Sequence, residues 1–469
     1  MQQAKFIGLD TVYPTASGET RRRIHMDGAA SPLASTVALA TIESLLPHYS
    51  NTHSYVHTSA QISTRALAWA HEKILACLQA DTEDYTAIFT GAGTTAGINR
   101  VARGLVNARP DKKIVLVSAM EHHANDLPHR QFDNDVHYIP LQGAGSQQGC
   151  IDLDELQNLL TKYDGKVNYI AVCAVSNVTG IINPITEISK LAHAHGALIV
   201  VDAAQSVAHR TTQLSREDNR EEVDFYIFSG HKLYTPTAPG VLLAKKHLLN
   251  DMTGQDLGGG SVCDVSYFDY QLMSQFPHKE QSGTPNIVGA IALARVFESL
   301  QQYGFDKIEQ HDFDLMTELL DALSSLPKIT IYGCAEHKRR IGAVAFNHSD
   351  IDHGLLAAIL SDYYSIAVRN DCFCAHPYVS SMLKESLWQI DLSDIPAEQH
   401  QNYINRKRGM VRISLALYNT SDDIDKVITA LSEISENIAE YRGQYHALDD
   451  GSYRHKSFTV NWKKQLGWE

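Results

Sequence analysis

Short runs of β-branched and other apolar residues alternate with amphipathic stretches in the first half of the chain. Five apolar runs predict buried strands, at residues 112–118, 169–175, 198–202, 223–228 and 240–244. Between the second and third runs, Pro184 near the start and Gly196 at the end of an amphipathic stretch predict a helix. Strand, helix and strand in that order are typical of a parallel crossover sheet, so residues 85–250 are expected to form an α/β domain.

The second half of the chain has a mixed pattern that follows a long apolar helical stretch at residues 286–304. Its predicted strands are KITIYG, GAVAFN, IAVR and VRISLALY, and its predicted helices lie near residues 352–361 and 421–437. This order indicates a smaller α+β layer. The predicted organisation is an N-terminal segment at 1–24, a large α/β domain at 25–300, a small C-terminal α+β domain at 301–439 and an arm of unassigned role at 440–469.

Composition narrows the class of protein. With 44% hydrophobic and 20% charged residues, the chain can bury a large core, which excludes disorder as its main state. The formal net charge of −14 opposes binding to a phosphate backbone, so no nucleic-acid partner is expected. The N-terminus has no apolar leader, no run approaches about 18 apolar residues, and the scattered cysteines suit a reducing compartment. We therefore expect a soluble cytoplasmic protein with no membrane partner.

The stretch VDFYIFSGHKLY places polar side chains directly after a predicted buried strand. Ser229, His231 and Lys232 stand where open α/β sheets bind their ligands, at the carboxyl end of a strand. A partly buried lysine at such a position can form a Schiff base with an aldehyde cofactor. The alternative is that Lys232 is an ordinary solvated lysine.

An aldehyde cofactor such as pyridoxal phosphate makes further demands on the chain. Its phosphate needs donors at a helix start, which the Gly-rich turn with Thr94 and Thr95 could supply, although a plain loop is an equal alternative. Its pyridine nitrogen needs a carboxylate, which Asp202 could supply unless it caps a helix. Its ring needs a flat neighbour, which MEHHAND offers after the strand at 112–118. No His/Cys set has a zinc-like spacing, so no metal site is predicted.

Five separated motifs, in order along the chain, resemble the class V aminotransferase family. They are MEHHANDLPH, NVTGIINPITEISKLAHAHGALIVVDAAQSVAH, FSGHKLYTPTAPGVLLAK, SGTPN and VRISLALYNTSDDIDKV. The similarity is to the Suf-type branch of cysteine desulfurases and selenocysteine lyases, and it extends from about His25 to Ile434. The resemblance implies a fold-type I enzyme, with a large, mostly parallel α/β domain and a smaller C-terminal α+β domain.

The same resemblance assigns the cofactor residues. Lys232 would bind pyridoxal phosphate as a Schiff base, and His123 would stack on the ring and carry a proton. Asp202 would pair with the pyridine nitrogen and Gln205 would contact the phenolic oxygen. The phosphate would be held by the turn with Thr94 and Thr95, by Ser229 and His231, and by Thr284 from a second subunit. The last assignment implies a homodimer with shared active sites.

The substrate residues implied by the resemblance lie elsewhere in the chain. Asn177, Arg369 and Arg412 would bind the substrate carboxylate, for which an arginine fork is well suited. The alternative for Arg412, which lies within a predicted strand, is a structural ion pair. In AVRNDCFCAHPY, Cys374 aligns with the sulfur-accepting nucleophile of the family. Cys372 and Phe373 replace two residues that are usually histidines.

Three functions are compatible with these residues. The first is a cysteine desulfurase, which converts L-cysteine, or selenocysteine, to L-alanine and leaves a persulfide on Cys374 for an acceptor protein. The second keeps the cofactor but performs another reaction, as a C–S lyase, an amino-acid epimerase or an aminotransferase. The third is a non-catalytic sulfur-relay protein, which would have no need for Lys232, Asp202, Gln205 and His123.

Overall fold

The computed structural model describes residues 5–52, 54–143, 146–252, 256–384, 396, 400–448 and 450–468. The chain forms two compact units. The large unit comprises Met1–Ile7, Ser31–Ser176 and Ile181–His311, and the small unit comprises Gly8–Ala30, Asn177–Gly180 and Asp312–Glu469. These units do not coincide with the four ranges expected from the sequence, because two short segments of the first half join the small unit. The four ranges stay a prediction about independently folding domains.

The large unit contains a seven-stranded sheet that confirms the predicted α/β class. Its strands, in spatial order, are β4 (Tyr85–Thr90), β10 (Gly240–Lys245), β9 (Phe225–Ser229), β8 (Leu198–Asp202), β7 (Val167–Cys173), β5 (Ile114–Ser118) and β6 (Asp135–Ile139). All five strands predicted from apolar runs are present within a few residues of their expected bounds. Each of these five is almost entirely buried, which explains why they appear as continuous apolar runs.

The parallel direction predicted for the sheet holds for five of its strands but not for β10. Strands β6, β5, β7, β8 and β9 are parallel, whereas β10 is antiparallel to both of its neighbours, β9 and β4. The segment between β9 and β10 contains no α-helix, and a parallel crossover normally needs one. Because β10 reverses between them, β4 runs in the same direction as β9. The carboxyl ends of six strands therefore share one edge of the sheet.

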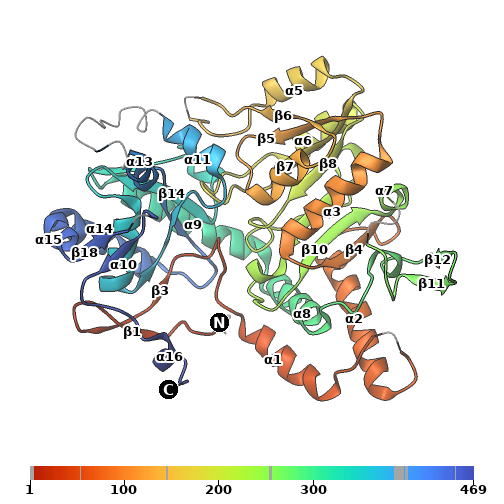
Figure 1. Ribbon diagram of the computed structural model, residues 1–469, viewed down its shortest axis with the longest axis horizontal. Helices are drawn as coiled ribbons and strands as arrows, with labels where there is room; N and C mark the ends of the chain where they lie inside the picture. Colours follow the sequence, from red (N-terminus) through yellow and green to blue (C-terminus); the bar gives the residue numbers. More distant parts are fainter. Residues whose placement is uncertain are drawn as a thin grey trace. The chain divides into compact units, whose positions relative to one another are not determined.

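Helices cover the sheet of the large unit (Figure 1). Helix α3 (Gly93–Ala108) packs on β9 and β10, and a Cβ added to Gly97 would lie 2.6 Å from Cγ2 of Ile227. The predicted helix at 184–196 is α6 (Ile185–Ala194), which packs on β8 and is followed by Gly196 at φ +66°. The long predicted helix is α8 (Ile287–Tyr303), which packs against α1 (Thr36–Leu45) and α2 (Thr58–Cys77).

The small unit is built on an antiparallel sheet. Its order is β13 (Ile329–Ile331), β14 (Ala343–His348), β17 (Met410–Ser414) and β16 (Arg369–Asp371). Helices α10 (His353–Tyr364) and α14 (Ser421–Glu436) share its apolar core. The N-terminal strand β3 (Ile24–His25) pairs with β15 (Ile366–Ala367), which fixes the segment Gly8–Ala30 in this unit.

The C-terminal arm packs back on α10. The Tyr453 hydroxyl donates to Asp352, 2.7 Å away, and the Tyr445 hydroxyl donates to Asp362 at 3.0 Å. The remaining helices are α4 (Leu127–Arg130), α5 (Leu153–Lys162), α7 (Lys246–Asp251), α9 (Phe305–Ser324), α11 (His376–Met382), α13 (His400–Lys407), α15 (Ile438–Gly443) and α16 (Trp462–Gln465), with short 3-10 turns at Leu46–His48, His123–Asn125, Asn219–Glu221, Gly230–Lys232, His278–Glu280 and His337–Arg339. The remaining strands are β1 (Val12–Pro14), β2 (Thr20–Arg22), β11 (Val262–Val265), β12 (Tyr270–Leu272), β18 (Tyr445–Ala447) and β19 (Tyr453–His455). Within the described ranges, no helix is both long and apolar enough to cross a membrane.

Candidate active site

Most of the predicted cofactor residues follow strand ends at one edge of the seven-stranded sheet. Thr94 and Thr95 follow β4, His123 follows β5, Asp202 ends β8, Gln205 lies in the loop after β8, and Ser229, His231 and Lys232 end or follow β9. This is the edge at which open α/β sheets bind ligands. The predicted substrate residues Asn177, Arg369 and Arg412 and the predicted nucleophile Cys374 belong to the small unit.

Thr94 and Ser229 form a hydroxyl pair at the start of α3. Oγ of Ser229 accepts from the backbone N–H of Thr94 and lies 2.8 Å from its Oγ1. Gly93 makes this close approach possible, because its φ is +58° and an added Cβ would lie 2.5 Å from Oγ of Ser229. The helix start leaves further backbone N–H groups for an anion, and the neighbouring Thr95 is exposed.

Asp202 is a buried carboxylate at the end of β8. Its Oδ1 accepts from the backbone N–H of Ala204, 2.9 Å away. Burial raises the pKa of Asp202, while the Ala204 hydrogen bond and the charge of Lys232 oppose that shift. Residues 203–209 form turns rather than a helix, so Asp202 does not cap a helix. A cationic N–H placed against this carboxylate would offset its desolvation.

The two adjacent histidines after β5 have different roles. Nδ1 of His122 accepts from the backbone N–H of Ala124, 3.0 Å away, so His122 caps the short 3-10 turn His123–Asn125. His123 is partly exposed, as a side chain that contacts a ligand must be. Of the pair, His123 is therefore the better candidate for contact with a cofactor ring.

Glu121, which precedes the histidine pair, was not singled out from the sequence. It is fully buried and accepts hydrogen bonds from Ser118, from Nδ2 of Asn125 at 2.7 Å and from the backbone N–H of Cys173 at 2.8 Å. Burial nevertheless raises the pKa of Glu121 to about 8. The residue joins β5, β7 and the histidine turn. Its position before the motif histidines was visible in the sequence, but its burial was not.

Lys232 lies in the 3-10 turn Gly230–Lys232 and is partly buried. Burial and the charge of Lys232 lower the pKa of the neighbouring His231. His231 is therefore mainly neutral near pH 7, and its Nδ1 lies 3.4 Å from Oγ of Ser31. A neutral imidazole can donate one N–H to an anion without adding a second positive charge beside Lys232.

Thr284 lies on an exposed loop of the large unit, where its Oγ1 accepts from Nδ2 of Asn51 at 3.1 Å. It helps to line a cavity of about 460 Å³, together with Gly91 of the glycine-rich turn. The cavity is also lined by the buried pair Arg100 and Glu280, whose side chains lie 2.5 Å apart. This ion pair was not predicted, because its members are widely separated in the sequence and lie outside the recognised motifs.

In the small unit, Arg412 is almost completely buried. Its Nη1 donates to the carbonyl of Asn177 at 2.8 Å, and its Nη2 donates to Asp27 at 2.9 Å. In the described part of the chain, Nε of Arg412 has no hydrogen-bond partner. The ion pair considered from the sequence is therefore present, but it does not satisfy the whole guanidinium group.

Arg369 stands directly opposite Arg412 in the antiparallel pairing of β16 with β17. Like charges in this arrangement repel each other, because directly opposed side chains lie on the same face of the sheet. Arg369 is exposed, and its charge lowers the pKa of Arg412, although burial lowers it more. An anion such as a carboxylate would relieve the repulsion between the two guanidinium groups.

The two neighbouring cysteines have contrasting environments. The backbone N–H of Ala375 donates to the carbonyl of Cys372 at 2.8 Å, which closes a tight turn with Phe373 and Cys374 at its tip. Both tip residues have left-handed φ angles, +52° and +56°. Cys374 is exposed, whereas Cys372 is buried and its pKa is raised to about 12 by burial and by Asp371. The exposed thiol is therefore the one at the predicted nucleophile position.

Phe373, which stands where the family usually has a histidine, contacts two of the substrate-binding candidates, Arg412 and Asn177. The guanidinium carbon of Arg412 lies 4.9 Å from the centre of the Phe373 ring, a cation–π contact. The carbonyl of Phe373 accepts from Nδ2 of Asn177, 2.8 Å away. Asn177 thus links the cysteine turn to Arg412, which the sequence motif did not indicate.

Comparison with known proteins identifies the family. The family model for class V aminotransferases matches residues 24–427. The chain therefore belongs to the class V aminotransferase family, which confirms the resemblance carried by the sequence motifs. Enzymes of this family have fold type I and depend on pyridoxal phosphate, so the chain is an enzyme of this class.

Several relatives cover most of the chain. A probable cysteine desulfurase from Halalkalibacterium halodurans is 34% identical over 423 residues, which is 88% of this chain and 93% of that protein. A cysteine desulfurase from Shigella sonnei is 33% identical over 417 residues, 87% of this chain and 93% of that protein. Among solved structures, a cysteine desulfurase from Thermococcus onnurineus superposes with a TM-score of 0.76 at 27% identity, covering 88% of this chain and 95% of that one.

Proposed function

We propose that this protein is a pyridoxal-phosphate-dependent cysteine desulfurase, which converts L-cysteine to L-alanine and leaves a persulfide on Cys374. The observation that carries the proposal is the position of the Cys374 thiol, which is exposed at the tip of a tight turn whose other cysteine is buried. The names of relatives that cover most of the chain support the same reaction. We propose L-selenocysteine, in which selenium replaces the sulfur of L-cysteine, as a second substrate.

The residues at the carboxyl edge of the sheet fit this cofactor. The start of α3, with Thr94, Thr95 and Ser229, suits a phosphate, and Gly93 leaves the approach open. Asp202 is a buried carboxylate, and burial raises its pKa. The positive charge of a protonated pyridine nitrogen would offset the cost of burying that carboxylate. When bound, pyridoxal phosphate supplies an aldehyde for the lysine and a ring that withdraws electrons from the substrate Cα.

The remaining cofactor contacts are assigned to other side chains near the start of α3 and Asp202. Gln205 would donate to the phenolic oxygen, His231 would donate to the phosphate, and Thr284 would reach the phosphate of a second subunit. His123 would stack on the ring and carry a proton. Lys232 would hold the cofactor before substrate binds and then remove the proton from the substrate Cα.

Arg412 and Arg369 are assigned to the substrate carboxylate, with Asn177 holding Arg412 and the cysteine turn. The unpartnered Nε of Arg412 and the repulsion between the two arginines both favour a bound anion. Phe373 restricts the movement of the Arg412 guanidinium through its ring contact. These residues would orient an α-amino acid, because every such substrate carries a carboxylate at Cα.

The sulfur-transfer step is assigned to Cys374. Its thiolate attacks the substrate sulfur, the new S–S bond forms, and the substrate Cβ–S bond breaks with its electron pair going to carbon. Protonation of that carbon and of Cα gives L-alanine, so L-cysteine and the Cys374 thiol become L-alanine and a Cys374 persulfide. The charge of Arg412 lies within electrostatic reach of Cys374.

We also propose that the protein acts as a cytoplasmic homodimer and passes its sulfur to an acceptor protein. The predicted reach of Thr284 into a second subunit requires a dimer. Exposed apolar side chains on the β11–β12 hairpin support such an interface, since Tyr267 and Phe268 are essentially fully exposed in a single chain. The persulfide on an exposed cysteine would be accessible to an acceptor thiol.

Product analysis with L-cysteine and dithiothreitol tests the reaction. We expect the wild-type protein to form L-alanine and sulfide in equal amounts. The Cys374→Ala variant should lose more than about 99% of this turnover while keeping the visible absorbance of the bound cofactor, because the thiol contributes to sulfur transfer and not to cofactor binding. The matched control is Cys263→Ser, which removes the other exposed cysteine and should keep wild-type turnover.

Two results would contradict the proposal. Unchanged alanine formation by Cys374→Ala would exclude the persulfide mechanism. Pyruvate with ammonia, a racemised amino acid or a keto acid from wild-type protein would instead identify a C–S lyase, an epimerase or an aminotransferase. Each of these products is distinguished from L-alanine by chiral chromatography.

A further inference from the structure

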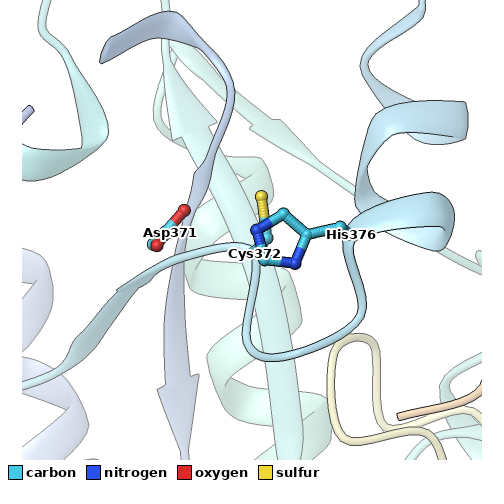
Figure 2. Close-up of side chains that lie close together, drawn as sticks. All are labelled: Asp371, Cys372 and His376. Carbon is cyan, nitrogen blue, oxygen red and sulfur yellow. The ribbon is translucent and has the colours of Figure 1, made fainter. Parts of the chain in front are cut away.

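Three potential metal ligands converge beside the cysteine turn. A carboxylate oxygen of Asp371, Sγ of Cys372 and a ring nitrogen of His376 all lie within 4.8 Å of one another. In Figure 2, Asp371 ends β16, Cys372 follows directly after that strand, and His376 begins α11. The three residues have no role in the proposed desulfurase reaction. Cys374 does not belong to this group, although it lies in the same turn.

We propose that Asp371, Cys372 and His376 form a zinc site. Thiolate, imidazole and carboxylate are the ligand types that zinc accepts in proteins, whereas magnesium and calcium prefer oxygen ligands alone. Three protein ligands leave one tetrahedral position for a water molecule. The site was not predicted from the sequence, because a single cysteine and a single histidine four positions apart match none of the paired zinc motifs.

The backbone around the cluster is well fixed. The hydrogen bond from the Ala375 N–H to the Cys372 carbonyl closes the turn and sets the separation of Cys372 from His376. Asp371 pairs with Met410 in the sheet, so the carboxylate side chain starts from an ordered strand. Asp371 also has a left-handed φ of +91°, which is costly for a residue other than glycine. A bound cation would offset part of that cost.

The three ligand atoms would need to move only slightly closer together to bind one zinc ion. Ligand atoms around tetrahedral zinc are about 3.5 Å apart, given bond lengths of roughly 2.0 to 2.3 Å. A spread of up to 4.8 Å must therefore shrink by about 1.3 Å at most. Cys372 is buried, whereas Asp371 and His376 are exposed.

The charge and proton balance of the site is simple. The Cys372 thiol donates to the carbonyl of Arg408, with the sulfur 3.5 Å from the oxygen. On binding, the S–H bond breaks, its proton passes to solvent, and a Zn–S bond forms without any change of oxidation state. One thiolate and one carboxylate neutralise the two charges of the metal.

Zinc at this position would tie the end of β16 to the start of α11 across the turn that carries Cys374. The metal would thus restrict the movement of the Cys374 turn without binding the Cys374 thiol. This distinguishes the site from adventitious zinc on an exposed cysteine, because the two depend on different thiols.

Equilibrium dialysis of tag-free, cofactor-loaded protein against buffered Zn²⁺, with metal measured by mass spectrometry, tests the proposal. We expect about one zinc per chain and the release of about one proton per zinc at pH 7.5. His376→Gln and Cys372→Ala should each weaken binding by more than about tenfold. His376 is exposed, so its replacement tests the site even if removal of the buried Cys372 impairs folding.

The controls separate this site from other metal ligands. Cys374→Ser and His446→Gln should keep the wild-type zinc stoichiometry, since Cys374 lies outside the cluster and His446 is an exposed histidine of β18. Absence of stoichiometric zinc from the wild-type protein would overturn the proposal. So would wild-type affinity in His376→Gln, or loss of zinc in Cys374→Ser. Because dialysis does not measure turnover, a protein that lacks desulfurase activity could still confirm the site.

Discussion

At the residue scale, the two cysteines of one turn differ in exposure, because Cys374 is exposed and Cys372 is buried. Only Phe373 separates Cys372 from Cys374 in the sequence, and the family motif indicated Cys374 as the nucleophile. The turn formed by Phe373 and Cys374 places one thiol outside and one inside, which no periodic pattern predicts, because it depends on two left-handed residues in succession. Such residues cost about 1 kcal/mol or more each, and they are typical of functional loops.

Glu121 gives a residue-scale prediction about pH. Its pKa is raised from an ordinary value of 4.5 to about 8 by burial. Between these two values the folded chain keeps the Glu121 proton while the unfolded chain releases it, so the contribution of Glu121 lowers the free energy of unfolding as pH rises. In Glu121→Gln this contribution is absent, and stability should fall less steeply between pH 5 and pH 8.

The same variant should be less stable than the wild type at pH 5, by about 1 to 3 kcal/mol, because its amide N–H₂ must face a donor, either Asn125 or the backbone N–H of Cys173. Urea unfolding at pH 5, 6.5 and 8 measures both effects. Glu83→Gln, which changes an exposed acid, serves as the control and should match the wild type at each pH. Equal pH slopes for Glu121→Gln and wild type would rule out this role for Glu121.

The sequence was informative about residues wherever a motif carried the chemistry. The motifs nominated Lys232, Asp202 and His123 as cofactor residues, and the structure places all three at or after strand ends. Arg100 with Glu280, and Asp371 with His376, were missed, because neither pairing follows from local spacing alone. Asn177 was recognised as a ligand candidate, but its hydrogen bond to the Phe373 carbonyl could be found only from the fold.

At the scale of elements, the apolar runs predicted five of the seven strands of the large sheet, all of them buried. Strand β4 is buried too but was missed, because Thr86 and Thr90 interrupt its apolar run. Edge strand β6 was missed because it is half polar, with only its last residue, Ile139, buried. The antiparallel direction of β10 was missed as well, since an apolar run carries no information about direction. The predicted strand at 411–418 ends early, at Ser414, where β17 leaves the sheet. Patterns thus identify burial well and pairing poorly.

The junction of β4 with α3 gives a prediction at this scale. Gly93→Ala should weaken pyridoxal-phosphate binding by about tenfold or more, which corresponds to about 1.4 kcal/mol. The added methyl group would lie 2.5 Å from Oγ of Ser229 and would separate that hydroxyl from Thr94. Titration of apoprotein with the cofactor, followed by absorbance, gives the dissociation constant.

Gly91→Ala is the matched control for this prediction, because a Cβ there meets nothing within 4 Å. It should bind the cofactor as the wild type does. If Gly93→Ala and Gly91→Ala had equal dissociation constants, the Thr94 and Ser229 pair would not be the phosphate site.

At the scale of the whole molecule, contacts between distant parts of the sequence determine the units. Ile24 pairs with Ile366, which places the N-terminal strand in the small unit rather than in a separate segment. No local pattern could have predicted this pairing, because two-residue strands carry almost no periodic signal. The predicted fold class was nevertheless correct, since it depends only on the order of strands and helices.

The proposed homodimer leads to the last prediction. The β11–β12 hairpin exposes Tyr267 and Phe268 almost completely, together with Val265 and Tyr270. An apolar group of this kind is costly in water and is typical of an interface between chains. Phe268→Asp should therefore shift the protein from dimer to monomer, as measured by sedimentation velocity. It should also weaken cofactor binding, because Thr284 is predicted to complete the site of the second subunit.

Val460→Asp provides the comparison, because Val460 is an exposed apolar residue on the C-terminal arm rather than on the hairpin. It should leave both the dimer and the cofactor affinity unchanged. A Phe268→Asp protein that stays dimeric would place the interface elsewhere. A monomeric variant that binds pyridoxal phosphate as tightly as the wild type would show that each chain holds its cofactor alone, and the assignment of Thr284 to a neighbouring site would then be wrong.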